Sequence, residues 1–301
     1  MGTPSYGAKD SILAFDTALP FDAASVLMLF DSETMTVDQE ILQDDGLSGT
    51  RSQRVERTRF GKRRVSGQVT FDASPIMLDQ LLYIISGTTE AADVFALAQT
   101  LPSFYLMIAK GARDFTFNNC ICNRASFKAE PGGKLKLVLD LEAESFTNSA
   151  SGTLSAIGLA MPTDKPFQFS DLVGTTVSAA RDIFSWETVI DHKIDAERWV
   201  NAVNRANLTS MGRDVLVNIE LPFSSSETDL VSVALAGSTG STAVYTNADA
   251  TASVLTFTYG ALQFPASIPV VNGKGEIRMQ LKGRALRTGS TLELSFTNAH
   301  A

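Results

Sequence analysis

The sequence predicts a mainly β protein with two tandem β-sandwich or β-barrel domains, each flanked by one α-helix and related by internal duplication. Residues 61–87 read as an alternating strand followed by a capped amphipathic helix, and residues 212–237 read the same way. The chain of 301 residues is also long enough for two cores of ordinary size. The alternative is two unrelated β segments with chance helix caps.

The first unit is defined by its strand and its helix. The buried face of the strand is expected to comprise Val65, Gly67, Val69 and Phe71, which alternate with polar residues. Ser74 and Pro75 supply an N-cap and a first helical residue, and Gly87 stands where a helix ends. An apolar stripe between them predicts that the helix packs on the core.

The second unit repeats these signals. The expected buried positions of its strand are Val215, Val217, Ile219 and Leu221. Ser224 and Glu227 have the spacing of a capping box, and Gly237 takes the place of Gly87. This agreement is the basis for predicting a duplication.

Domain boundaries follow from composition along the chain. Residues 1–30 are expected to form an N-terminal arm that crosses onto a neighbouring subunit, and residues 31–150 form the first domain. The segment 46–60 is predicted to be an exposed loop or a projecting hairpin. Residues 151–180 are expected to be a linker or arm, because the stretch 147–158, which runs into this segment, has the small polar composition of a linker. The second domain then spans residues 181–301.

The remaining strands also recur. In the first domain, strands are expected at Phe104–Ala109, at Phe115–Phe127 and around Leu137, Leu139 and Leu141. In the second, Trp186–Ile194 parallels Ser32–Glu40, and Val254–Thr258 parallels Phe104–Ala109. Ile277, Met279 and Leu281 are expected to repeat the inward positions of Leu137, Leu139 and Leu141, and Leu292–Phe296 is expected to be the final strand.

Composition argues against an enzyme, a metalloprotein or a membrane protein. The chain has 2 cysteines and 2 histidines, too few for most nucleophile–histidine arrangements or a structural zinc site. Cys120 and Cys122 are expected to be buried thiols, and Glu142 and Glu144 to lie on a solvated strand face. No catalytic residue, cofactor or metal is predicted. No apolar run approaches the ~20 residues that cross a bilayer, and no secretion signal is evident, so synthesis in a cytoplasm is expected.

Charge is strongly polarised near the N-terminus, although the net charge is only −8. A basic run follows an acidic tract. The basic residues are Arg51, Arg54, Arg57, Arg59, Lys62, Arg63 and Arg64; the acidic residues include Asp31, Glu33, Asp38, Glu40, Asp44 and Asp45. The run is interpreted as a solvated loop, as a nucleic-acid site with only Phe60 for stacking, or as a loop that contacts the acidic tract of the next subunit in a head-to-tail stack.

The order from the basic loop through GKRRVSGQVTFDASP to MLDQLLYIISG resembles the tail tube proteins of long-tailed bacteriophages, and in outline the tube proteins of type VI secretion. The resemblance covers roughly residues 30–146 and 180–297. It implies a structural virion protein of the phage tail, made in the bacterial host cytoplasm. It also implies rings of six tube domains that stack into a conduit for phage DNA, with a long loop that reaches the neighbouring ring.

Two domains in one chain would let three chains build a pseudo-hexameric ring, although a hexamer of chains stays open. The implied partners are other copies of the chain, the tape measure, terminator and baseplate proteins of the tail, and DNA that passes without specific binding. The basic run becomes the inter-ring contact loop and the acidic tract its partner. The candidates for the inner surface are Gln68, Thr70, Asp140, Glu142, Asn218, Glu220 and Gln280.

Two other functions compete with the tube subunit. One is another tail component of similar fold, such as a tail terminator, baseplate hub or decoration protein. The other is a duplicated β-sandwich module that binds sugar or nucleic acid.

Overall fold

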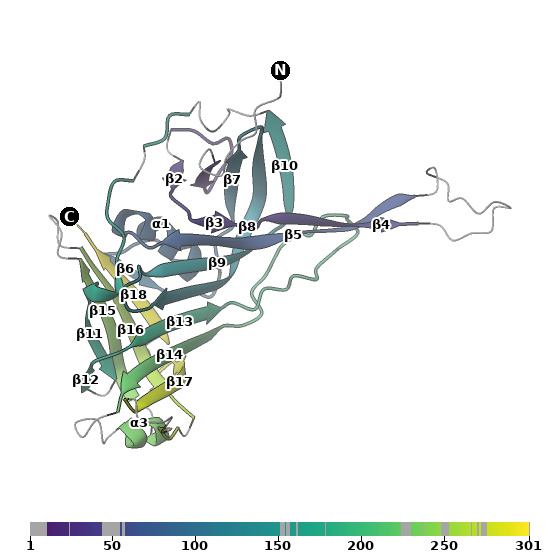
Figure 1. Cartoon of the computed structure of the whole chain (residues 1–301). Coiled ribbons are helices and arrows are strands. Elements are labelled where there is room, and N and C mark those ends of the chain that lie inside the picture. The colour runs from purple at the N-terminus through teal and green to yellow at the C-terminus, as the bar shows by residue number, and fades with distance from the viewer. Residues whose placement is uncertain are drawn as a thin grey trace.

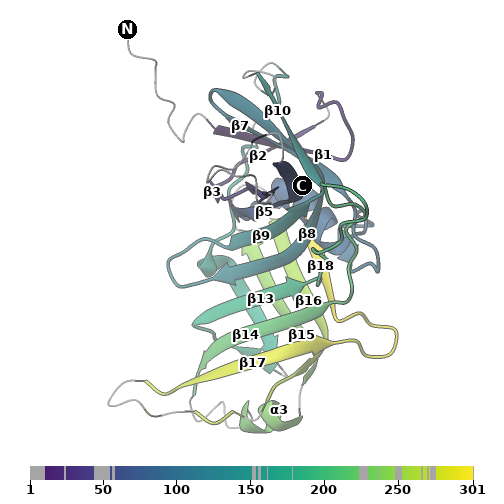
Figure 2. The same cartoon turned by 90° about the vertical axis from the view of Figure 1, so that its right-hand side faces the viewer.

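Antiparallel strands dominate the computed structural model (Figures 1 and 2). It describes residues 11–300 apart from 24, 44–54, 56–57, 151–153, 155–156, 161, 178, 224–229, 237, 248–252, 266, 270 and 272–275. The strands are β1 (Ser11–Asp16), β2 (Val26–Met28), β3 (Ser32–Glu33), β4 (Thr36–Leu42), β5 (Arg59–Asp72), β6 (Val94–Ala96), β7 (Phe104–Lys110), β8 (Arg113–Ala129), β9 (Lys136–Ala143), β10 (Ser145–Ala150), β11 (Leu172–Val177), β12 (Ala179–Arg181), β13 (Ser185–Asp191), β14 (Asp214–Pro222), β15 (Ser238–Asn247), β16 (Ser253–Gln263), β17 (Arg278–Leu286) and β18 (Leu294–Ala299). The helices are α1 (Pro75–Ser86), α3 (Leu230–Ala236) and the 3-10 helix η3 (Phe169–Asp171).

The first predicted unit forms as its local pattern dictates. Along β5, Val65, Val69 and Phe71 are buried, as the alternation predicts. Gly67 is only partly buried, and the backbone of Met35 passes so close that a Cβ on Gly67 would lie 2.5 Å from the Cα of Met35. Helix α1 then begins at Pro75 and ends at Gly87, whose φ of 81° is the left-handed conformation that favours glycine.

One long sheet positions everything else. Its strands pair antiparallel in the order β4, β5, β9, β8, β13, β14 and β17. Figure 1 shows β5, β9, β13, β14 and β17 lying side by side down the molecule. The β8–β13 pairing, Arg124–Ala129 with Trp186–Asp191, joins the N-terminal half of the chain to the C-terminal half.

Two further groups of strands continue from this sheet. In the N-terminal half, β8 also pairs with β10 and β7, and β7 with β1, which pairs with β2. In the C-terminal half, β16 pairs with β15, β17 and β18; β15 pairs with β11, and β11 with β12. Strand β6 of the first half pairs with β18 of the second, so strands of both halves meet twice.

The core is continuous between the halves. One buried cluster contains residues from Leu13 to Phe296, and α1 packs against β8, β16 and β18. Its centre is aromatic: the Phe127 ring of the first half lies 5.1 Å from the Phe257 ring and 5.7 Å from the Phe296 ring of the second. Trp186 packs on Phe257 with a centroid separation of 4.5 Å. The apolar surfaces of the two halves are therefore buried against each other in one core.

Several boundaries differ from the sequence-based prediction. Residues 11–28 were expected in an N-terminal arm, but β1 and β2 are part of a sheet, with Leu13 and Phe15 buried. Residues 145–150, partly expected in a linker, form β10, and residues 172–177 form β11. These strands are short and carry many small or polar residues, so their pairing depends on long-range partners rather than local pattern. The expected N-terminal arm that crosses onto a neighbouring subunit could now comprise only residues 1–10, which lie outside the described residues.

The second helix differs from the first. Helix α3 has 7 residues, lies at the bottom of the molecule in Figure 1, well away from α1, and leaves Leu235 exposed. The expected capping residues Ser224 and Glu227, and Gly237, lie outside the described part of the chain. Over the residues that the structure describes, neither helix has the length and apolar character to cross a membrane.

Candidate assembly surfaces

The most prominent exposed feature is a hairpin made by β4 and β5, which we call the arm. Figure 1 shows it projecting sideways from the long sheet. Most of the segment 46–60, predicted to be an exposed loop or a projecting hairpin, lies outside the described residues. Strand β5 pairs with β9 only from Val65 to Asp72, so its first half, from Arg59 to Arg64, extends beyond β9. Among the described residues, the strand partner of Arg59–Arg64 is therefore β4.

The outer part of the arm is apolar as well as basic. Ile41 pairs with Phe60, and both side chains are exposed, Phe60 to 68%. Leu42, the next residue on β4, is exposed as well. Large apolar side chains gathered on a projecting hairpin are typical of a contact surface for another molecule. Sequence reasoning missed this feature because the basic residues dominated the segment, although Ile41-Leu42 was a readable signal.

Parts of the acidic tract and of the basic run lie on the two strands of one hairpin: Asp38 and Glu40 are on β4, and Arg59, Lys62, Arg63 and Arg64 are on β5. Asp38 pairs with Arg64 and Gln39 with Arg63 in the β4–β5 register. Arg63 donates from Nε and NH2 to the Gln39 Oε1 atom, at 3.2 and 2.9 Å. The Lys62 backbone N–H donates to Glu40 Oε2 at 3.4 Å. Of these contacts, Asp38 opposite Arg64 joins opposite charges across the two strands.

Two other acidic candidates are engaged elsewhere in the chain. Asp31 forms an ion pair with Lys136, and Glu33 forms one with Lys110 at 2.6 Å. Arg59 is exposed at the outer end of β5. Arg51, Arg54, Arg57, Asp44 and Asp45 lie outside the described residues.

The solvent-facing side of the long sheet is a polar surface that runs through both halves, and we call it the polar face. Registers bring Gln68 opposite Asp140, Asp140 opposite Arg124, and Arg124 opposite Asp191. The other candidates on this face are Thr70, Asn218, Glu220 and Gln280, with Glu220 directly opposite Gln280. Since the reverse side of every one of these strands is buried, this is the side of the sheet that meets solvent.

Charge on the polar face is balanced rather than acidic. Its acidic residues are Asp72, Asp140, Glu187, Asp191, Asp214 and Glu220, and its basic residues are Arg124, Lys128, Lys136, Arg278, Lys282 and Arg284. Burial raises the pKa of Asp140. Burial acts the same way on Asp72, but hydrogen bonds from Lys134 and Lys136 outweigh it and lower the pKa of that carboxyl. Opposite charges thus alternate across neighbouring strands.

Glu142 is the exception among the candidates for the inner surface, and the prediction that it is solvated is wrong. It is 4% exposed, because residues 192–213 cover it. Arg205 donates to its Oε2 atom at 2.6 Å and Arg64 to its Oε1 atom at 2.7 Å. The hydrogen bond and charge of Glu142 raise the pKa of Arg64. The sequence pattern did not predict a role for Arg205, because it is a single arginine in a segment richer in apolar residues.

Within the described residues, no group of three or more His, Cys, Asp and Glu side chains is arranged to hold a metal ion. Cys120 and Cys122 are free and buried, as predicted, and burial raises the pKa of both thiols. Such thiols are poor nucleophiles.

These features define a mainly antiparallel β protein that offers other molecules a projecting arm, strand edges and a polar sheet face. Residues 3–297 match the family model of phage tail tube proteins, so the chain belongs to this family. Among curated proteins, no sequence match was found. The family is structural, which implies a non-enzymatic protein located in the virion tail.

Proposed function

We propose that the chain is the major tail tube subunit, and that three copies form a pseudo-hexameric ring. In this proposal, rings stack into the conduit through which phage DNA is delivered, and other tail proteins bind the tube at its ends or inside it. The observation that supports a ring of three chains best is that the two halves repeat one scheme of strand pairing.

The pairings of the two halves can be compared strand by strand. In the first half, β4–β5, β5–β9, β9–β8, β8–β7, β7–β1 and β8–β10 pair antiparallel. In the second, the corresponding pairs are β13–β14, β14–β17, β17–β16, β16–β15, β15–β11 and β16–β18. Helices α1 and α3 each follow the second strand of the scheme. We therefore assign two copies of one tube unit, the first ending near residue 150 and the second beginning near 172.

This scheme changes three of the predicted correspondences. Thr36 pairs with Ser66 and Val189 with Leu216, so Thr36 takes the position of Val189, a shift of one residue from the predicted match of Trp186–Ile194 with Ser32–Glu40. Val254–Thr258 lies in β16, whose counterpart is β8, so the counterpart of Phe104–Ala109 is β15. In the registers, Val65 pairs with Ala143 and Val215 with Ala285. Leu137 and Leu139 therefore correspond to Met279 and Leu281, a shift of two residues from the predicted alignment, and Ile277 lies before β17.

The junction between the halves suggests how one chain meets the next. Within the chain, β8 extends beyond the residues that pair with β7, and this last part of β8 pairs with β13 of the second half, with Ser126 opposite Val189. The counterpart of β13 is β4, whose strand partner among the described residues is β5. Ser126 lies opposite Val138 on β9, and the counterpart of Val138 is Gln280 on β17. The Ser267 hydroxyl donates to the backbone oxygen of Gln280, so we take Ser267 as the counterpart of Ser126.

A disulfide cross-link tests this arrangement. The register places Thr36 at the position of Val189, so Thr36 of one chain would lie opposite Ser267 of the next. Directly opposed residues on antiparallel strands have the Cα separation that a disulfide requires. We expect Thr36→Cys/Ser267→Cys to give covalent dimers and closed trimers on mild oxidation. Each single variant serves as a control, because both native cysteines are buried.

The outcomes separate the candidates. Covalent species that stop at three chains, together with stacked tubes in negative-stain images of the wild type, support the proposal. A ladder that extends to six chains would replace it with a ring of six. Closed rings that never stack at any concentration would favour a terminator or another end component. A stable monomer without rings would contradict a tube subunit.

The polar face is our candidate for the lumen, with Gln68, Thr70, Asp140, Asn218, Glu220 and Gln280 on it. Its balanced charge suits passage of DNA without tight binding, since a basic surface would hold the phosphates through counterion release. Glu142 is excluded because it is buried within its own chain.

The arm is our candidate for the contact with the next ring. Its exposed Ile41 and Phe60 give it an apolar anchor, which the acid–base contact predicted from sequence did not include. We expect Phe60→Ser to leave the ring intact and to reduce stacking, as measured by tube length in negative stain. Unchanged tube length would remove the arm from the inter-ring contact.

A further inference from the structure

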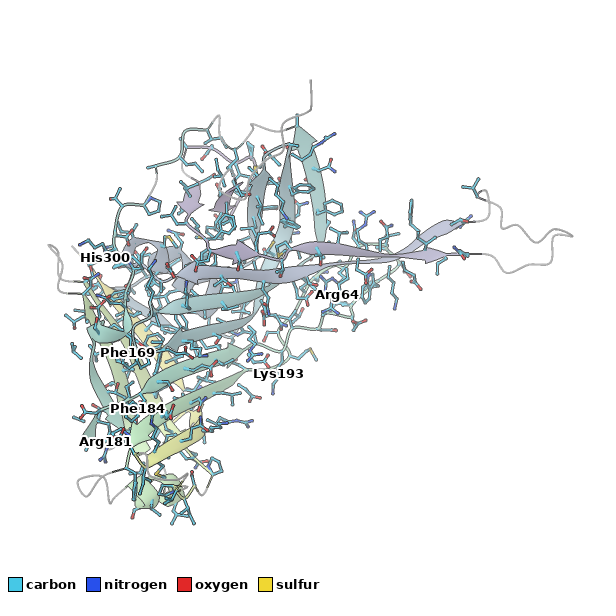
Figure 3. All side chains as sticks on the ribbon, viewed as in Figure 1. Arg64, Phe169, Arg181, Phe184, Lys193 and His300 are labelled. Carbon is cyan, nitrogen blue, oxygen red and sulfur yellow. The ribbon has the colours of Figure 1, made fainter. Side chains whose placement is uncertain are left out.

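The connection between β13 and β14, residues 192–213, corresponds in element order to the connection between β4 and β5 in the first half. The two connections behave differently. Figure 1 shows the arm projecting away from the sheet, while the 192–213 connection runs back along the arm's base. Arg64 at that base and Lys193 at the start of the connection are labelled in Figure 3.

Backbone contacts join this connection to the unpaired edge of β5. The Arg63 N–H, which lies beyond the last residue paired with β9, donates to the Val203 oxygen at 2.9 Å. Arg63 also forms a parallel bridge with Asn204. The Trp199 indole donates from Nε1 to the Arg63 oxygen at 3.3 Å, and the Lys62 ammonium lies 4.7 Å from the Trp199 ring centroid. The connection thus supplies the partner that β9 no longer offers.

Arg205 anchors the connection beneath the arm. Its side chain is 0% exposed and donates from NH1 to Glu142 at 2.6 Å and to the Ala196 oxygen at 3.2 Å. From NH2 it donates to the Ala143 oxygen at 2.8 Å and to the Val65 oxygen. Glu142 also accepts from Arg64 on the arm. One buried carboxylate therefore ties together β9, the base of the arm and the connection.

Such an anchor matters because a two-stranded hairpin outside a sheet has little stability of its own. Its direction depends on what holds its base. Hydrogen bonds to charged groups in a buried site are stronger than neutral ones, and they fix geometry as well as contribute energy.

We propose that residues 192–213 form a brace that sets the direction of the arm, with Arg205 as the positioning residue. The two tube units therefore have different roles: the first extends an arm and the second supports it. This consequence rests on the proposed function: a ring of three chains extends three arms toward a second copy of the ring. The arms lie at alternate positions around the pseudo-sixfold axis.

Hydrogen exchange on the full-length protein tests the brace directly. We expect Arg205→Met to speed exchange of backbone amides in residues 59–66 by about tenfold or more, since it removes the charged hydrogen bonds at the base. The matched control is Arg213→Met, which removes the partly buried ion pair with Glu293 at the other end of the same connection. The control should leave residues 59–66 unchanged. Trp199→Phe, which removes one hydrogen bond, should give a smaller increase.

Assembly provides the second readout. Arg205→Met should still form rings but should give fewer and shorter tubes than the wild type. Unchanged exchange in residues 59–66, or an equal increase in Arg213→Met, would overturn the brace. If Arg205→Met does not fold, the Trp199→Phe comparison decides the question by the same criterion. Six arms per ring in averaged images of tubes would overturn the division of roles.

The exchange measurement does not depend on the proposed function. If the wild type forms neither rings nor tubes, the tube proposal fails while the exchange comparison still tests the brace.

Discussion

Phe127 provides the sharpest test of how the two halves depend on each other. It lies on β8 in the first half, is fully buried, and contacts the rings of Phe257 and Phe296 in the second. The change we consider is Phe127→Ala, which removes the ring from the shared core while leaving the β8 backbone in place.

The magnitude follows from burial and geometry. Truncating a fully buried Phe to Ala costs about 3–5 kcal/mol through lost transfer energy and the remaining cavity. Two close aromatic contacts each add about 0.5–1.5 kcal/mol to what burial alone contributes, which favours the upper end of that range. At about 2–4 °C per kcal/mol for a chain of this size, the melting temperature should fall by about 10 °C or more.

The assay is thermal and urea unfolding of the soluble protein, followed by circular dichroism and by the fluorescence of Trp186 and Trp199, both in the second half. Because the core is shared, we expect one transition by both probes in the wild type and one lower transition in Phe127→Ala. Ile76→Ala, at an exposed position on α1, should change stability by less than about 0.5 kcal/mol. Two separate transitions, with fluorescence unaffected by the mutation, would refute the reasoning.

Three further predictions concern single sites. Glu142→Gln leaves the Arg205 guanidinium buried without its countercharge, so urea unfolding should show a loss of about 3–5 kcal/mol. Gly87→Ala forces a side chain into a φ of 81° and places its Cβ 2.5 Å from the Thr100 oxygen, so it should cost about 2 kcal/mol or more. Burial, assisted by Arg213, lowers the pKa of His192 to about 4, while the unfolded chain has a pKa near 6.5. The unfolded state therefore binds the proton first, and stability should fall with pH below 6.5, by about 2 kcal/mol at pH 5, in the wild type but not in His192→Gln.

Each of these has a control in the same chain. Glu130→Gln removes an exposed ion pair with Lys128 and should cost less than about 1 kcal/mol; an equal loss at both sites would contradict the buried pair. Gly132→Ala has a φ of 76° but open space around its Cβ, so it should cost less than Gly87→Ala, and equal costs would exclude the clash. A His192→Gln protein with the wild-type pH profile would show that another group carries the effect.

Local pattern was a reliable guide where the structure is local. The alternation of Val65, Val69 and Phe71 predicted β5, and Pro75 and Gly87 predicted the limits of α1. Leu137, Leu139 and Leu141 predicted β9 for the same reason, since side chains alternate across a strand whatever its partner. Local pattern did not predict β1. Its residues, Ser11–Asp16, form a strand because they pair with β2 on one side and β7 on the other.

The candidate surfaces were predictable in part. The pairing of β4 with β5 places Asp38 opposite Arg64, so the charge pattern of the sequence marked residues that meet on one hairpin. The relation of this hairpin to residues 192–213 was not predictable, because Arg205 and Glu142 are 63 residues apart and no local signal links them. A carboxylate at an outward strand position looks solvated until a distant segment covers it.

By itself, the sequence determined a mainly β chain, the strand and helix of the first unit, the buried cysteines and the polarised charge near the N-terminus. These depend on side-chain period, capping and composition, which act over a few residues. Only the tertiary structure decided that β8 pairs with β13, that the two halves share one aromatic core and that Glu142 is buried beneath Arg205. Pairing and burial between distant segments depend on which surfaces meet, and a single sequence carries that information only through the folded chain as a whole.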